Sequence, residues 1–106
     1  MPVLLFATLD TKGHEAAFVR DELRAADVEV VLVDCGVLGE PAVEPDIARE
    51  ELFRAAGTTL AAVREKNERG EAVNAAARGA AALAKRFHAE KKLTGVFGLG
   101  GSAGTT

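Results

Sequence analysis

Three short apolar runs, separated by segments with helical spacing, are the feature that most constrains this fold. The runs cover residues 3–9, 28–33 and 93–99, and the first two are rich in Val, Leu and Phe with almost no polar alternation. Such strands are typical of parallel sheets that helices cover on both faces. Strands that alternate with helices imply right-handed crossovers, most simply in the order 2-1-3. We therefore predict an α/β, three-layer fold with a parallel sheet.

The segments between the runs predict helices. Apolar residues recur at three- and four-residue steps in residues 15–26 and in the alanine-rich residues 71–91. A stretch with several Gly and Pro residues precedes two shorter helices, for which Asp46 and either Thr58 or Thr59 are the predicted N-caps. The charged residues that follow Asp46, which are Arg49, Glu50 and Glu51, are interpreted as a solvated helix face.

The length and strand order predict part of one domain. The chain has 106 residues, which is the size of one small domain. In the order 2-1-3 the third strand is a bare edge, and the glycine-rich residues after it have no following helix. We therefore expect residues 1–106 to be the amino-terminal part of a single longer domain, or else a partner to cover this edge.

The composition argues against several functional classes. A net charge of -3 and the absence of Trp and Tyr argue against nucleic-acid binding. The single cysteine, Cys35, cannot form an internal disulfide, and two scattered histidines do not complete a zinc site with it. The sequence lacks a signal-peptide pattern and an apolar run long enough for a membrane helix. We therefore expect a cytoplasmic protein with no nucleic-acid or membrane partner.

Candidate ligand-binding residues follow each predicted strand. In doubly wound sheets, ligands bind beyond the carboxyl ends of the strands. The segments at that edge are Asp10–Gly13, Asp34–Gly36 and Gly100–Thr106. If the first strand is central, its loop lies next to both of the others.

The glycine-rich segment after the third run is suited to phosphate binding. Glycine lets backbone N–H groups approach phosphate oxygens, and one serine and two threonines add hydroxyl donors. The pattern G-x-G-x-x-A is met formally through Gly98, Gly100 and Ala103, but after the third strand instead of the first. The alternative is an ordinary tight turn or tail. The candidate residues are Gly100, Gly101, Ser102, Ala103, Gly104 and Thr105.

The segment Asp10-Thr11-Lys12-Gly13 is the second candidate. The helix dipole disfavours the Lys12 charge at a helix N-terminus, and a bound anion would resolve that conflict. Gly13 would permit close approach of a phosphate. In the alternative interpretation, Lys12 points to water or pairs with Asp10.

Asp34 ends the second run and has two possible roles. It could accept hydrogen bonds from a ribose hydroxyl, or it could cap its own loop through Cys35 and Gly36. Neither Cys35 nor His14 has an evident base or orienting partner, so nucleophilic catalysis has little support. The sequence assigns no reaction, and whether the protein is an enzyme stays open.

The order of five segments carries a family resemblance. They are ATLDTKGHE (7–15), VDCGVLG (33–39), PDIAREE (45–51), RGEAV (69–73) and GLGGSAGT (98–105). In this order they resemble the amino-terminal region of the family of the tomato tobamovirus-resistance protein, which has largely uncharacterised bacterial members.

The resemblance implies a Rossmann-like ATP-binding module. It places Thr11, Lys12 and Gly13, together with residues 100–105, against the nucleotide, and magnesium would accompany the phosphates. The family usually has Gly where this chain has Ala103. The expected function is therefore ATP binding by an amino-terminal module of a larger protein, with a small-molecule nucleotide as its ligand. Members of the family are several times longer, so the resemblance implies that the remainder of the first domain and the carboxyl-terminal domain are absent here. The exposed edge strand and the alanine-rich helix lead us to expect association as a homo-oligomer, or association through that absent carboxyl-terminal part.

Two alternatives stay open at this point. One is an oxidoreductase domain for an NAD(P)-type dinucleotide, which the formal glycine pattern and Asp34 motivate. The other is an interaction module without a small ligand, in which the glycine-rich segment only turns the chain. The alanine content and the excess of Arg over Lys suggest a bacterial source.

Overall fold

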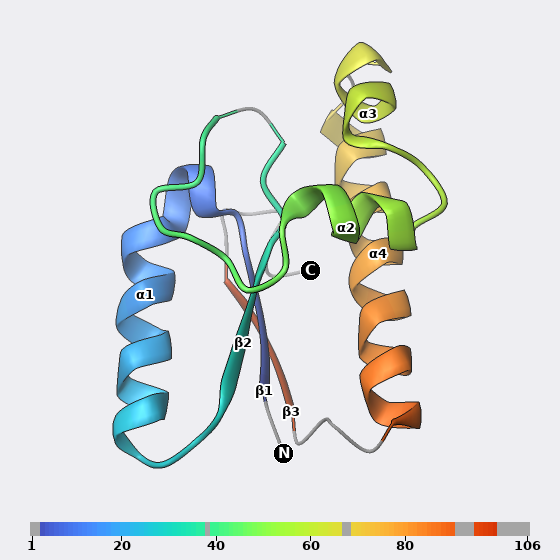
Figure 1. Cartoon of the computed structure of the whole chain (residues 1–106). Coiled ribbons are helices and arrows are strands. Elements are labelled where there is room, and N and C mark those ends of the chain that lie inside the picture. Colours follow the sequence, from blue (N-terminus) through green and yellow to red (C-terminus); the bar gives the residue numbers. More distant parts are fainter. Residues whose placement is uncertain (1–2, 38, 67–68, 91–94, 100–106) are drawn as a thin grey trace.

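The structure is a computed structural model, and it describes residues 3–37, 39–66, 69–90 and 95–99. The chain forms a three-stranded parallel sheet with the order β2-β1-β3, as predicted. Figure 1 shows α1 on one side of the sheet and α2 and α4 on the other, which confirms the α/β three-layer arrangement. In chain order the elements are β1 (Val3–Ala7), α1 (Leu9–Ala25), β2 (Val30–Asp34), α2 (Arg49–Ala55), α3 (Leu60–Lys66), α4 (Arg69–Ala89) and β3 (Gly95–Leu99).

The central strand has a buried residue at every position, which explains its continuous apolar sequence. Successive side chains of a strand point to opposite faces. Leu4 and Phe6 accordingly belong to the core cluster that includes Leu52 and Phe53 of α2. Leu5 and Ala7 belong to the second cluster, with residues of α1 and β2. Helices therefore cover β1 on both faces.

The first helix begins earlier than the sequence pattern predicts. It starts at Leu9, directly after β1, because the Thr8 carbonyl accepts the N–H groups of Thr11 and Lys12 and so closes a first turn. Lys12 has non-helical dihedral angles, with φ -121° and ψ 22°, and marks a kink inside α1. The predicted loop at residues 10–13 is thus the first turn and kink of a helix.

Of the N-caps predicted for the two short helices, the one for α3 is confirmed and the one for α2 is wrong. Thr59 caps α3 as predicted, since its Oγ1 accepts the Ala62 N–H at 3.1 Å. The prediction for Asp46 is wrong. Its Oδ2 accepts the Leu32 N–H at 2.8 Å, while the backbone runs beside β2 through a bridge between Val33 and Ile47. The N–H and C=O groups at the edge of β2 need hydrogen-bond partners, and residues 46–47 supply them. Asp46 therefore does not cap α2.

Gly79 sets how closely α2 and α4 can pack. A Cβ atom built at Gly79 would overlap the carbonyl oxygen of Leu52, a backbone atom that cannot rotate away. We predict that Gly79→Ala destabilises the protein by about 1–3 kcal/mol, as expected for overpacking, in spite of the higher helix propensity of alanine.

Urea unfolding measures this effect, and Gly70→Ala in α4 is the matched control. A Cβ at Gly70 meets no atom within 4 Å. Its substitution should leave stability unchanged or raise it by up to about 1 kcal/mol. Equal stability of the two variants would show that α2 and α4 do not pack closely at Gly79.

Candidate functional site

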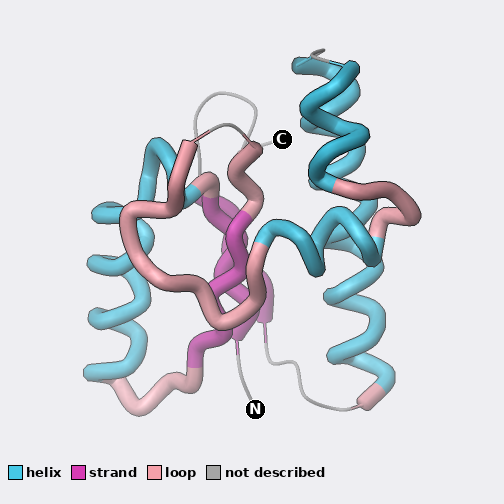
Figure 2. The backbone as a smooth tube through the Cα atoms, turned by 45° about the horizontal axis from the view of Figure 1, so that its top comes forward, coloured by secondary structure: helices cyan, strands magenta, loops and turns pink. Residues whose placement is uncertain are grey.

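The carboxyl end of the sheet brings two of the three predicted segments together. In the register of the sheet, Ala7 lies opposite both Asp34 and Leu99, so all three strands end at one edge. The α1 helix begins at this edge, and Figure 2 shows the loop between β2 and α2 running beside it. The predicted residues Gly100–Thr105 lie outside the described residues, so their part of the site stays a prediction.

Asp34 is buried at this edge, with an exposed fraction of 1%. Its Oδ1 accepts the N–H groups of Leu9, at 3.3 Å, and of Gly36, at 2.8 Å. The bond from Gly36 is the loop-capping role that the sequence offered as one of two alternatives. Asp34 thereby joins the end of β2 to the start of α1.

Arg49, the first residue of α2, supplies the positive charge that balances Asp34. Its Nε donates to Asp34 Oδ2 at 2.8 Å, and its Nη1 donates to the Gly39 carbonyl at 2.6 Å. Arg49 is only 4% exposed, so its interpretation as part of a solvated helix face is wrong. A carboxylate at the end of an apolar strand needs a cationic partner if it is buried, but local sequence does not say which arginine provides it.

Asp10 connects α1 to the loop after β2. Its Oδ2 accepts the Gly39 N–H at 3.2 Å, and the residue is half-buried. A little further along, the Ala42 N–H donates to the Leu9 carbonyl at 2.9 Å. Gly13 permits this approach, because a Cβ there would lie 2.6 Å from the Ala42 Cβ. Ala42 of the loop thus occupies the space at the glycine that was predicted to let a phosphate approach.

Lys12 and Thr11 lie at the surface of the same edge. Lys12 Nζ pairs with Glu15 at 3.5 Å, and the lysine side chain is 39% exposed. Ion pairs at this level of exposure contribute little stability, so the lysine can exchange this partner for another anion at low cost. Thr11 is exposed, and its Oγ1 lies 2.9 Å from Thr8 Oγ1. Both residues are accessible to a ligand.

Comparison with known proteins identifies the family. The model of the N-terminal domain of the Uncharacterised protein family UPF0261 matches residues 1–106. The chain belongs to the UPF0261 family. No solved structure matches it significantly.

Curated relatives of this UPF0261 domain come from bacteria. A UPF0261 protein from Clostridium tetani is 35% identical over 104 residues, which are 98% of this chain and 26% of the relative. A protein of the same family from Brucella suis is 34% identical over 103 residues, which are 97% of this chain and 25% of the relative. One from Rhizobium meliloti is 36% identical over 104 residues, with 98% and 25% coverage. The chain therefore spans about a quarter of the length of these relatives.

Cys35 lies next to the buried pair but is not a reactive thiol. Burial raises the pKa of Cys35 to about 12, and the neighbouring Asp34 carboxylate adds to the increase. The thiol is therefore protonated at neutral pH, whereas nucleophilic attack needs the thiolate.

Among the described residues of the UPF0261 domain, no group of three or more His, Cys, Asp or Glu side chains is arranged to hold a metal ion.

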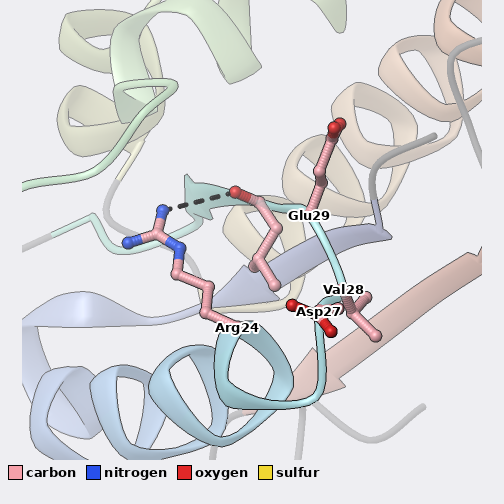
Figure 3. A pocket seen from close by; sticks show the side chains of 5 residues that line it. Arg24, Asp27, Val28 and Glu29 are labelled. Atoms are coloured by element: carbon pink, nitrogen blue, oxygen red, sulfur yellow. Dashed lines mark hydrogen bonds between the residues drawn. The ribbon is translucent and has the colours of Figure 1, made fainter.

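A surface depression lies at the opposite end of the sheet. Its volume is about 420 Å³, and Figure 3 shows the residues that line it, where α1 turns into β2. Arg24 Nη2 donates to the Val30 carbonyl at 3.5 Å and lies 3.9 Å from Asp46 Oδ2. Val30 begins β2, so this depression is at the amino end of the strand and away from the predicted site.

In the described part of the chain, no helix is long and apolar enough to span a bilayer.

Proposed function

We propose that this UPF0261 domain binds a nucleotide, ATP with magnesium, at the carboxyl end of its sheet. One observation carries the proposal: the parallel order β2-β1-β3 puts the start of α1 at the end of the central strand, between the ends of its two neighbours. Open α/β sheets bind ligands at this place. We also propose that the likeness to the family of the tomato tobamovirus-resistance protein reflects a shared ATP-binding module.

The start of α1 is suited to holding a polyphosphate. N–H groups at a helix N-terminus attract anions. Those of Leu9, Thr11 and Lys12 already have partners, so the proposed contact is with the second run of helical turns, which begins at Gly13 after the kink. Lys12 is exposed enough to leave Glu15 and contact a phosphate. The segment 100–105, which follows β3 in the sequence, is proposed to contact the phosphates as well.

Magnesium is proposed to enter with the phosphates. It usually keeps several water ligands and binds through one or two carboxylates together with substrate phosphates. A ready-made cluster of protein ligands is therefore not required for this ion. Its chemical contribution would be to neutralise charge on the phosphate oxygens.

Calorimetry on the intact protein tests the proposal. We predict that ATP with magnesium binds and that Lys12→Ala weakens binding by about 10- to 100-fold, since a hydrogen bond to a charged group contributes about 1.5–3 kcal/mol. Lys85→Ala, at an exposed position of α4, is the matched control and should bind ATP normally.

Two results would contradict the proposal. If the intact protein binds no adenine nucleotide at millimolar concentration, the site does not hold ATP. If NAD displaces ATP and binds much more tightly, the domain is a dinucleotide-binding module instead. Asp34 already accepts three hydrogen bonds, so the role of ribose acceptor that motivated this alternative would require it to give up a partner.

A further inference from the structure

We propose that the sheet continues at the outer edge of β3 in the intact protein, with a fourth parallel strand beside β3 and the helix that leads to it packed over Val96. Both elements would come from the same polypeptide, from the region that follows this domain in its longer relatives. The proposed docking surface lies along the side of the sheet and does not depend on nucleotide binding.

The other edge of the sheet is already occupied. The N–H groups of Asp46 and Ile47 donate to the Leu32 carbonyl at 2.8 and 3.0 Å. The Leu32 N–H donates to the Asp46 carboxylate at 2.8 Å. The Asp34 N–H donates to the Ile47 carbonyl at 3.0 Å. A further strand could pair with β2 only by displacing this segment, so growth of the sheet is directed to β3.

The outward-facing backbone groups of β3 belong to Val96 and Gly98. On β1, the Val3 N–H pairs on the β2 side, with the Glu29 carbonyl at 2.8 Å. Neighbouring residues of a strand direct their backbone groups to opposite sides, so those of Leu4 face β3. Leu4 lies opposite Val96 in the parallel register, and a residue in this position bonds with the two neighbours of its partner. The N–H and C=O groups of Val96 and Gly98 therefore point away from β1.

Nothing in the sequence of β3 protects this edge. The strand reads Gly-Val-Phe-Gly-Leu and contains no charged residue and no proline. Exposed edge strands usually carry such residues, which prevent pairing with another strand. No strand lies beyond β3 in the sheet that the described residues form. The edge is therefore suited to a strand partner.

Val96 lies on the face of the sheet that α4 covers. It is opposite Leu4, and opposed residues of neighbouring strands point to the same face. Leu4 is fully buried in the core cluster that includes Leu83 of α4, whereas Val96 is 51% exposed. Parallel sheets are normally covered on both faces, so an apolar side chain this exposed calls for a further helix beside α4.

The handedness of the crossovers predicts the same face. The step from β1 to β2 places α1 on one face, and the step from β2 back across β1 to β3 places α4 on the other (Figure 1). A right-handed connection outward from β3 continues in this second direction, so its helix lies on the α4 face. The exposure of Val96 and the rule of handedness are independent, and both point to this position.

The longer relatives contain enough chain to supply both elements. The matched region is the N-terminal domain of the family and makes up 26% of the Clostridium tetani relative, so about three quarters of that protein lies outside it. A parallel crossover needs only about a dozen residues or more. A segment joined to β3 also has a higher effective concentration than a separate partner, which favours the same polypeptide as the occupant.

Maleimide labelling of an introduced thiol in the intact protein tests the inference. Val96→Cys should react at least about tenfold more slowly than Phe18→Cys, because a covered thiol reacts only during local openings. Phe18→Cys is the matched control, at a position of α1 that is 67% exposed. The wild-type protein gives the background from Cys35, a thiol that is protonated at neutral pH. After unfolding in urea, both introduced thiols should react at the same rate.

Two labelling results would overturn the inference. Equal rates for the two folded variants would mean that no helix covers Val96. A rate for Val96→Cys that rises on dilution would mean that a second copy of the protein supplies the cover, since association depends on concentration.

Hydrogen exchange of the wild-type intact protein covers the case in which Val96→Cys does not fold. We expect the N–H groups of Val96 and Gly98 to exchange at least about a hundredfold more slowly than in an unstructured peptide. Exchange at the peptide rate would mean that no strand pairs with β3. The inference would then be wrong whether or not the protein binds a nucleotide.

Discussion

Asp34→Ala is expected to lower the free energy of unfolding by about 3–5 kcal/mol, because it leaves the buried guanidinium of Arg49 without its counter-charge. The two side chains are 1% and 4% exposed, and their 2.8 Å contact is a direct hydrogen bond. The substitution also removes the acceptor for the N–H groups of Leu9 and Gly36, at the junction of β2 and α1. Chemical denaturation followed by circular dichroism measures the loss.

Asp21→Ala is the matched control for this substitution. Asp21 pairs with the adjacent Arg20, and its side chain is 65% exposed. An exposed pair contributes about 0–1 kcal/mol, so this variant should be close to wild type. A loss below about 1 kcal/mol for Asp34→Ala would contradict the buried pair, since removal of one partner from such a pair costs several times more.

A double-mutant cycle isolates the coupling between the two residues. Adding Arg49→Ala to Asp34→Ala removes the uncompensated charge, so the double variant should be more stable than the sum of the two single losses predicts. Additive losses would mean that Asp34 acts through its backbone partners alone.

Phe53→Ala is expected to destabilise the protein by about 3–5 kcal/mol, which is typical of a large aromatic side chain lost from a core. Phe53 is fully buried, and it shares its core cluster with Leu4 and Phe6 of β1 and Leu83 of α4. The variant leaves a cavity between the sheet and the helices on this face, because a closely packed core relaxes only partly around a lost side chain.

Phe18→Ala supplies a control of the same residue type. Phe18 is on α1 and is 67% exposed. Its substitution should change stability by less than about 0.5 kcal/mol, as surface substitutions usually do. Thermal or urea unfolding of the two variants side by side measures the difference. Similar losses at both positions would mean that α2 does not pack against the sheet at Phe53.

The strand order was predictable because it follows from local patterns and from one rule of chirality. Each apolar run is short and contiguous, and right-handed crossovers leave 2-1-3 as the simplest arrangement. The position of Lys12 at the sheet's carboxyl edge followed from the same argument. The exact start of α1 was not predictable. Gly13 suggests a loop, whereas the N–H groups of Thr11 and Lys12 donate to the Thr8 carbonyl and close a helical turn before that glycine.

By itself the sequence determined the architecture of this UPF0261 domain, since apolar periodicity and glycine placement act over a few residues. Only the tertiary structure decided which polar groups meet at the carboxyl edge. Asp34 and Arg49 are 15 residues apart in the chain, and Asp10 and Gly39 are 29 apart. Burial makes each charge depend on a partner that distant parts of the chain supply, and no local pattern encodes that pairing.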